Sequence, residues 1–439
     1  MNEISPKSVL LGVLPNDDIL SQCIHCGLCL SACPTYELTK LERSSPRGRI
    51  RLIKAVAKGE MPITKTFADE MLFCLDCQAC ETACPAGVKY GTMVEAARVE
   101  IEKAGYGSTS GRLIKKFALR VILASRINLK IAAKFLYFYQ NFGIQKFLHK
   151  SGIFKIVSPR LGEVDKLAPS VSKVFSNTMV KEITKPNGSV KYKTAFLTGC
   201  LMDVMFAEIN KDTIDVLSAC GCEVFSPKDQ VCCGSLHAHN GDIETAKKLA
   251  KKNIDVFEKY DYQYLISNSA GCGAFMKEYG KVLADDPIYS ERAKKFSQKV
   301  KDVTEFLAVE KPIKNFGEVH ETVTYHDACH LAHTQKVVSE PREVLKSIPG
   351  LKIKNLEESN WCCGSAGIYN IVRYEDSMRI LNRKMNNIQN TEAEIVLTGN
   401  PGCIQQIKYG AEKFNVNIKV MHPITLIKQA ILNGKNNSH

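Results

Sequence analysis

The chain lacks the sequence features of several large classes of protein. It contains no run of the roughly 18 uninterrupted apolar residues that a membrane-spanning helix needs. Residues 1–18 lack the basic start and apolar stretch of an export signal. No G-x-G-x-x-G sequence follows an expected strand, and no Walker loop occurs. We therefore expect a cytoplasmic protein that binds no dinucleotide itself.

Cysteine, by contrast, is abundant, with 18 among the 439 residues. In a chain without an export signal, cysteines serve more often as metal ligands or redox groups than as disulfides. We therefore expect a reducing environment and chemistry based on thiolates.

Two runs of cysteines have the spacing C-x2-C-x2-C-x3-C-P of bacterial ferredoxins, which hold [4Fe–4S] clusters. Three thiolates on a tight loop reach one cluster, and the fourth, beyond a turn, completes the cluster of the other run. One cluster is therefore expected on Cys23, Cys26, Cys29 and Cys84. The other is expected on Cys74, Cys77, Cys80 and Cys33. Zinc is the alternative, but its paired cysteine knuckles fit this spacing poorly.

Between the two runs, Ser44–Arg51 contains three arginines, at positions 47, 49 and 51. One interpretation is a solvated turn. The other is a basic segment that docks on an acidic partner or shields the charge of a cluster.

A second, longer repeat fills the rest of the chain. Its landmarks are a lone cysteine, a Cys-Cys-Gly sequence and a Gly-Cys pair, and they recur at offsets of 129 (200 to 329), 130 (232 to 362) and 131 (272 to 403). Each copy gathers four thiols that are candidate redox groups or ligands of a further cluster or metal: Cys200, Cys232, Cys233 and Cys272, then Cys329, Cys362, Cys363 and Cys403. The alternative is a packing role, which we expect for Cys220 and Cys222.

Each copy of the repeat is predicted to be an α/β domain. Short apolar runs precede the cysteines and predict strands at Thr194–Thr198, Tyr264–Ile266, Val323–Tyr325 and Ile395–Thr398. Helical patterns at Asp242–Phe257 and Tyr374–Ile388 lie between them, which favours parallel sheets with the cysteines at the strand ends. Histidines at 237, 239, 326, 330 and 333 lie close to these cysteines; such residues ligate metals or move protons, or are ordinary structural histidines.

The chain thus divides into an α-helical ferredoxin-like domain (14–104), a basic helical region with a linker (105–190), and two α/β repeats (191–310 and 320–432). The linker is expected around Ser158-Pro159 and Lys185–Gly188. Residues 111–150 contain nine Lys and Arg and no Asp or Glu, mixed with apolar residues such as Phe117 and Phe135. This pattern suits either a helix on the cytoplasmic face of an anionic membrane or a helical linker packed on the protein, and not a nucleic-acid site.

The two ferredoxin runs, the Ser44–Ile50 sequence and the two Cys-Cys-Gly (CCG) repeats resemble the iron–sulfur subunit of glycolate oxidase over residues 15–430. The resemblance implies an electron-transfer subunit of a flavin-linked 2-hydroxy-acid dehydrogenase that oxidises glycolate to glyoxylate. It also implies FAD on a flavoprotein partner, and a quinone or other electron acceptor. The corresponding subunits of anaerobic glycerol-3-phosphate dehydrogenase, lactate-utilisation proteins and heterodisulfide reductase are similar in plan.

One departure from that plan concerns thiol chemistry. The full CCG pattern of heterodisulfide reductase ends each repeat with C-x-x-C, whereas Ser269 and Asn400 replace the first cysteine of that pair here. The replacement argues against a five-thiolate cluster and against the alternative of a thiol–disulfide reductase. A zinc-bound scaffold is a third hypothesis.

Overall fold

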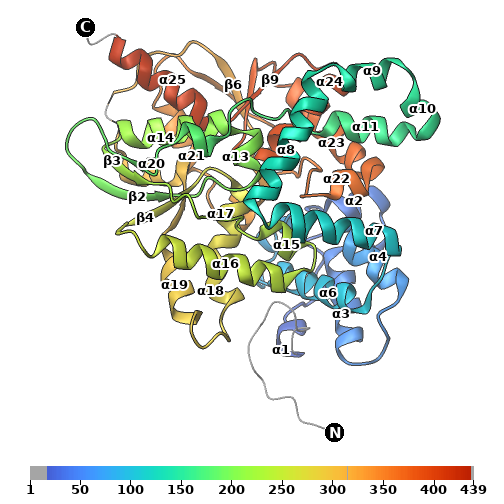
Figure 1. Ribbon diagram of the computed structural model, residues 1–439. Helices are drawn as coiled ribbons and strands as arrows, with labels where there is room; N and C mark the ends of the chain where they lie inside the picture. The colour runs from blue at the N-terminus through green and yellow to red at the C-terminus, as the bar shows by residue number, and fades with distance from the viewer. Residues whose placement is uncertain (1–16, 314, 437–439) are drawn as a thin grey trace.

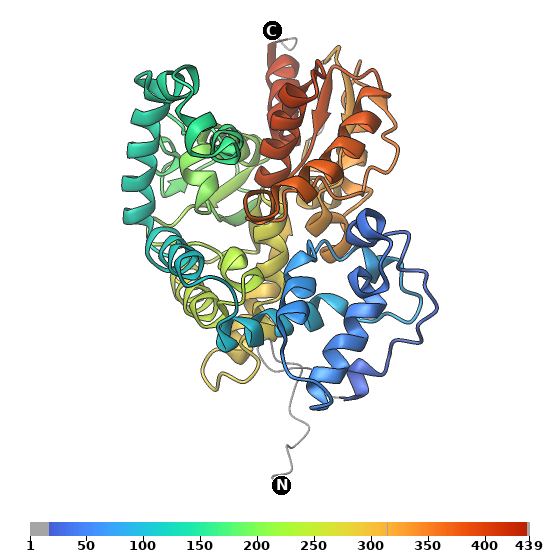
Figure 2. The ribbon, with the colours of Figure 1, turned by 90° about the vertical axis from the view of Figure 1, so that its right-hand side faces the viewer.

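The computed structural model describes residues 17–313 and 315–436, so residues 14–16 of the expected first domain lie outside the described residues. It contains a helical N-terminal domain, a helical linker and two α/β repeats (Figure 1). Figure 2 shows the N-terminal helices (blue) below the second repeat (orange to red). The predicted fold class is confirmed.

The N-terminal domain is built from short helices around one apolar core. They are α1 (Asp17–Leu20), α2 (Pro34–Thr39), η1 (Glu42–Ser44), α3 (Pro46–Ala57), α4 (Lys65–Phe73), α5 (Ala79–Thr82) and α6 (Tyr90–Ala104). Ile53, Met71 and Met93 are fully buried in this core. The first cysteine run lies on a loop between α1 and α2. The second lies between α4 and α6, on loops and the short helix α5, which contains Cys80.

The linker is almost entirely helical. It consists of α7 (Thr109–Lys116), the π-helix η2 (Phe117–Leu123), α8 (Arg126–Asn141), α9 (Ile144–Lys150), α10 (Ile153–Val157), α11 (Pro159–Leu167) and α12 (Ser176–Met179). Leu129 and Ala133 of α8 pack into the core of the first repeat. Ser158-Pro159, where a linker is expected, lies within this region, and Pro159 opens α11 at a position where its missing N–H costs nothing.

The first repeat has a sheet in the order β1-β3-β2-β4-β5, in which only β1 is antiparallel. Its strands are β1 (Ile183–Thr184), β2 (Tyr192–Phe196), β3 (Cys222–Phe225), β4 (Tyr264–Ser267) and β5 (Val300–Asp302). Its helices are α13 (Leu201–Met205), α14 (Ala207–Ala219), α15 (Ser235–His239), α16 (Ile243–Phe257), α17 (Ala270–Lys277), α18 (Tyr279–Val282), α19 (Ser290–Gln298) and α20 (Val303–Glu310).

The second repeat has a fully parallel sheet in the matching order β7-β6-β8-β9. Its strands are β6 (Thr322–Tyr325), β7 (Lys352–Lys354), β8 (Ile395–Leu397) and β9 (Lys419–Met421). Its helices are the π-helix η3 (His330–Thr334), α21 (Glu340–Lys346), α22 (Tyr369–Val372), α23 (Tyr374–Gln389), α24 (Pro401–Lys413) and α25 (Pro423–Asn436). The predicted parallel sheets are confirmed.

The topology explains where the cysteines of each repeat lie. The chain leaves the central strand (β2 or β6) toward one edge of the sheet and returns to its other side (β4 or β8). A crevice opens at the carboxyl ends of strands where the winding changes direction in this way. Cys200 and Cys329 follow the central strands, and Cys272 and Cys403 lie in the first turns of α17 and α24.

The two repeats share an apolar core. Helix α25 packs against α14 of the first repeat, and Phe196, Val323 and Ile424 belong to one buried cluster. Cys220 and Cys222 lie in this core, where burial raises the pKa of the Cys220 thiol to about 12. Within residues 17–313 and 315–436, none of the helices combines the length and apolar character needed to cross a bilayer.

Candidate metal centres

The second ferredoxin run encloses a small cavity. Cys74, Cys77 and Cys80 line it together with Cys33 of the first run, which is the grouping that the crossed arrangement of ligands requires. Burial raises the pKa of Cys77 and Cys80 well above the ordinary value, so these thiols need a bound cation to ionise.

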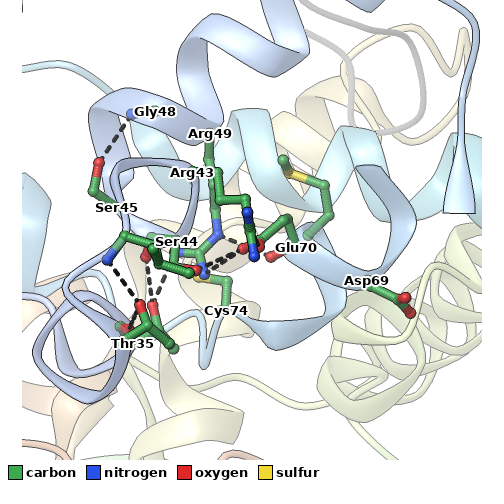
Figure 3. A network of polar contacts seen from close by, with 12 residues as sticks. Thr35, Arg43, Ser44, Ser45, Gly48, Arg49, Asp69, Glu70 and Cys74 are labelled. Carbon is green, nitrogen blue, oxygen red and sulfur yellow. Dashed lines mark hydrogen bonds and ion pairs between the residues drawn. The ribbon is translucent and has the colours of Figure 1, made fainter. Parts of the chain in front are cut away.

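A buried arginine supports this cavity (Figure 3). Arg49 is fully buried, donates from Nε to the Glu70 carbonyl at 2.8 Å and from Nη1 to the Thr35 hydroxyl at 2.9 Å. The same hydroxyl lies 3.3 Å from the Cys33 sulfur. Arg43 and Ser44 hold the Glu70 carboxylate, each at 2.9 Å. The interpretation of this segment as a solvated turn is therefore wrong for Arg49, which places a positive charge beside the thiols.

The first ferredoxin run is more exposed. Cys23 and Cys29 are partly buried against the N-terminal core, as is Cys84 of the second run, and Cys26 is exposed. Arg47 closes the loop by donating from Nη1 to the His25 carbonyl at 3.0 Å, while Glu42 accepts from its Nε at 2.6 Å. The first run thus forms a surface loop, whereas the second run lies in the interior.

The eight cysteines of the two quartets line a single cavity, which also includes Ser269 and Asn400. Within each quartet the thiols contact one another in sequence. Cys200 contacts Cys232 and Cys233 contacts Cys272 in the first repeat, and the corresponding pairs form in the second. Burial and these contacts raise the pKa of most of the thiols. The Asn400 amide donates to the Cys403 sulfur at 3.5 Å.

The glycine of each CCG sequence allows a close approach of two backbone segments. Gly234 has a φ of +94° and Gly364 a φ of +87°, conformations that other residues rarely adopt. A Cβ atom at Gly364 would lie 2.8 Å from the Ser377 carbonyl oxygen, and one at Gly234 would lie 3.2 Å from the Ala246 carbonyl oxygen. The bulky neighbour that these glycines accommodate is therefore the backbone of α23 or α16.

The cavity of the repeats adjoins the cavity of the second ferredoxin run. Cys74 lines both cavities. Cys77 packs in one buried cluster with Phe73, Trp361 and Cys362, against which Cys329 is partly buried. Thiols of the N-terminal domain and of the second repeat therefore lie beside one another.

Family models match segments of the N-terminal domain, of the linker and of both repeats. The cysteine-rich domain model matches residues 194–277 and 323–408, and the 4Fe-4S dicluster domain model matches residues 19–88. A third model, the linker region of the glycolate oxidase iron-sulfur subunit, matches residues 110–168. A probable glycolate oxidase iron-sulfur subunit of Bacillus subtilis (strain 168) is 41% identical over 417 residues, which cover 94% of each chain. The chain belongs to the glycolate oxidase iron–sulfur subunit family.

Other relatives fit this membership. The glycolate oxidase iron-sulfur subunit of Escherichia coli (strain K12) is 28% identical, and the match covers 95% of this chain and 96% of that one. Lactate utilization protein A of Bacillus subtilis (strain 168) is 30% identical but matches only 52% of this chain. The similarity to lactate-utilisation proteins therefore extends over only about half of this chain.

One of the two [4Fe–4S] clusters of the dicluster domain fits the residues around the second-run cavity. Hydrogen-bond donors point at the thiol sulfurs, since the backbone N–H of Asp76 lies 3.3 Å and the Tyr90 hydroxyl 3.5 Å from the Cys74 sulfur. The buried Nη2 of Arg49 has no hydrogen-bond partner. Such donors and an adjacent cation stabilise the anionic thiolates of a cluster.

Sequence reasoning missed a buried polar group that joins the N-terminal domain to the first repeat. Asp76 lies inside the second run, and its carboxylate contacts His239 Nδ1 at 3.2 Å and Arg98 at 3.4 Å. Glu95 lies 2.9 Å from the same ring nitrogen, and the His239 ring stacks on His330. The hydrogen bond with His239 and the charge of Arg98 lower the carboxyl pKa of Asp76 to about 2 despite its burial. The contact spans 163 residues, and the sequence clues were the position of Asp76 inside a cysteine run and that of His239 close to a CCG sequence.

Replacing Arg49 by glutamine is expected to lower the reduction potential of the second-run cluster. Loss of one positive charge at a distance of about 8 Å costs about 2 kcal/mol at an effective dielectric constant of about 20, which is equivalent to about 90 mV for one electron. Potentiometric titration followed by EPR measures the shift. Arg51→Gln is the matched control, because the Arg51 side chain is 62% exposed. Equal potentials in both variants would contradict the assigned role of Arg49.

Proposed function

We propose that this chain is the electron-transfer subunit of a flavoprotein complex that oxidises a 2-hydroxy acid, with glycolate as the substrate. Oxidation of glycolate to glyoxylate releases two electrons and two protons, which a flavin on the partner accepts together. A [4Fe–4S] cluster then takes these electrons one at a time. The observation that carries the proposal is the adjacency of the two cavities, with Cys74 in the wall of both.

The ligand sets that we propose are those of the crossed arrangement. Cys33, Cys74, Cys77 and Cys80 hold the interior cluster, and Cys23, Cys26, Cys29 and Cys84 hold the cluster near the surface. The CCG quartets hold a further iron–sulfur centre in each repeat. Their support is the contact of the four thiols within each repeat and the position of both quartets on one cavity.

The surface loop of the first run is the proposed docking site of the flavoprotein. Ile24 is 70% exposed and Leu28 is 58% exposed on either side of the exposed Cys26. Apolar contact of these side chains with the flavoprotein would place the flavoprotein next to Cys26 and the surface cluster. This loop is therefore the entry point for electrons.

The substrate and partner are tested by reconstitution with the flavoprotein of the same organism. Addition of glycolate under anaerobic conditions should bleach the visible absorption of the clusters, and Ile24→Asp with Leu28→Asp should slow the bleaching about tenfold or more without loss of iron. If lactate or glycerol 3-phosphate bleached the clusters and glycolate did not, the assignment of glycolate as the substrate would be wrong. Turnover of a disulfide by this chain alone would favour the thiol–disulfide reductase.

The linker leaves an apolar surface exposed. Five of the nine basic side chains of residues 111–150 pair with acidic residues of the protein, among them Arg120 with Asp242 and Arg126 with Asp203. The large apolar residues exposed within 111–150 are Leu113, Ile114, Phe117, Val121, Ile127, Ile131, Phe135, Phe138, Phe142, Ile144 and Phe147. Lys134, Lys146 and Lys150 are also exposed on α8 and α9. We propose that this surface lies on the anionic cytoplasmic face of a membrane, where a quinone is the electron acceptor.

Binding to lipid vesicles tests this surface. Sedimentation with vesicles that contain an anionic lipid should exceed sedimentation with neutral vesicles, and Phe135→Glu with Phe147→Glu should weaken it about tenfold. The control is Ile288→Glu, because Ile288 is 68% exposed but lies in the first repeat. If the double variant bound anionic vesicles as well as the natural chain does, this surface would not be a membrane-binding surface, and a protein partner would be its occupant.

The reducing cytoplasm is the proposed compartment. All 18 cysteines lie in the described part of the chain, and none of them forms a disulfide. Cysteines that bind metal ions must be reduced, and a reducing compartment keeps them so.

A further inference from the structure

Each CCG repeat has a buried histidine beside its thiols, but the two histidines come from different positions. His326 follows β6, whereas the first repeat has Leu197 at the equivalent position, 129 residues earlier. His237 lies in α15, whereas the second repeat has Gly367 there, 130 residues later. The repeat pattern alone therefore does not account for either histidine.

The ring of His326 is oriented with one nitrogen free. The side chain is 1% exposed, and Nδ1 lies 3.1 Å from the Ser359 carbonyl oxygen. Because a carbonyl only accepts, Nδ1 carries the proton and Nε2 has a lone pair. The buried Nε2 has no hydrogen-bond partner. A metal-binding imidazole has this arrangement, in which the other ring nitrogen donates to a carbonyl.

Two sulfurs lie where the His326 ring can share a metal ion with them. A ring nitrogen of His326 and the sulfurs of Cys363 and Cys403 all lie within 4.8 Å of one another. At a tetrahedral metal ion with bond lengths of about 2.0–2.3 Å, neighbouring ligand atoms lie about 3.5–3.8 Å apart. The three donors therefore need to move together by at most about 1 Å to close around an ion.

A buried cation lies beside the thiols of the second repeat. The Lys384 ammonium donates to the Glu358 carbonyl and lies near Cys362 and Cys363, whose negative charge it offsets. A neutral imidazole next to thiolates that face a buried cation is a suitable ligand set for an iron–sulfur centre.

His237 of the first repeat is oriented in a similar way, but here Nε2 contacts a carbonyl and Nδ1 is the free nitrogen. The side chain is fully buried, and Nε2 lies 2.8 Å from the carbonyl oxygen of Leu119 in the π-helix of the linker. The buried Nδ1 has no hydrogen-bond partner, and the ring contacts the Cys232 thiol. The linker thus orients the free nitrogen of this ring toward the first quartet.

We propose that His326 Nε2 and His237 Nδ1 are ligands to iron in the centres of the two CCG repeats. Each imidazole supplies a fifth donor to a quartet in which Ser269 or Asn400 stands in place of a fifth cysteine. The inference rests on the proposed function in one respect, namely that the CCG quartets hold iron–sulfur centres. A neutral imidazole in place of a thiolate lowers the negative charge of a centre and raises its potential.

Pulsed EPR of the full chain, reconstituted anaerobically and partly reduced, tests the assignment. Protein with natural-abundance histidine should show a strong nitrogen coupling, which should change to the ¹⁵N pattern when only histidine is labelled. His326→Gln should remove the coupling from one centre and His237→Gln from the other. His326→Cys should remove the coupling while retaining the iron, because it restores a fifth thiolate.

The matched control is His422→Gln. His422 is 1% exposed, but its Nε2 contacts the Asn268 carbonyl and its Nδ1 accepts from the backbone N–H of Ile424, so it has no nitrogen free for a metal. This variant should keep both couplings. Iron above about eight atoms per chain without any histidine coupling would overturn the ligand assignment and leave the proposed CCG centres intact. An iron content of only about eight atoms per chain would overturn both the histidine ligands and the CCG centres. If the couplings are present but glycolate does not reduce the protein, only the proposed substrate is wrong.

Discussion

Cys77→Ala is expected to stop electron transfer through this chain and to remove one of its clusters. Cys77 lines the interior cavity of the N-terminal domain and packs with Cys362 of the second repeat. Its loss removes one ligand of the interior cluster at the point where the two sets of thiols adjoin. Glycolate-dependent reduction of the acceptor by the complex should fall about 100-fold or more, and the iron content should fall by about four atoms per chain.

Acceptor reduction and iron content are measured on the purified complex, with Cys77→Ser as a second variant that keeps the size of the side chain. Cys222→Ala is the control, because Cys222 is fully buried in the core between the repeats and lines neither cavity. The control should keep its iron and its rate even if it unfolds at a lower temperature. A Cys77 variant with the iron content and rate of the natural chain would remove the basis of the proposed function.

Gly364→Ala is expected to destabilise the second repeat more than any surface substitution. The positive φ costs an alanine about 1 kcal/mol, and its Cβ would press on the Ser377 carbonyl oxygen of α23. We expect a total loss of about 3–5 kcal/mol, since neither the turn nor the helix can move without displacing Cys363. The unfolding temperature of the repeat should fall by about 10 °C.

Differential scanning calorimetry measures this shift, and Gly59→Ala separates the two causes. Gly59 has a φ of +71°, but nothing lies within 4 Å of an added Cβ. The control should therefore lose only the conformational part, about 1 kcal/mol. Equal shifts in the two variants would mean that contact with α23 contributes nothing.

The sequence carries the information that depends on local spacing. The ferredoxin runs follow from eight cysteines at fixed intervals, and the two repeats follow from landmarks that keep their register. The strands that precede Cys200 and Cys403 could be predicted because the carboxyl end of a parallel strand is a recurrent place for a site.

Features that depend on contacts between distant segments could not be predicted. The burial of Arg49 requires α3 to pack on α4 and α6, and the pairing of Asp76 with His239 requires the first repeat to dock on the second cysteine run. The basic stretch seemed free for a partner because its acidic counterparts, Glu102, Asp203 and Asp242, lie outside it in the sequence. A single sequence does not reveal which elements meet.

The packing of Trp361 gives the protein an internal optical reporter. It is the chain's one tryptophan, it is 8% exposed, and it lies in the cluster that contains Cys77 and Cys362. All indole emission therefore originates at the junction of the N-terminal domain and the second repeat. Iron–sulfur clusters absorb where indole emits, so the emission of one residue follows the loading of the adjacent centres during maturation, without any label.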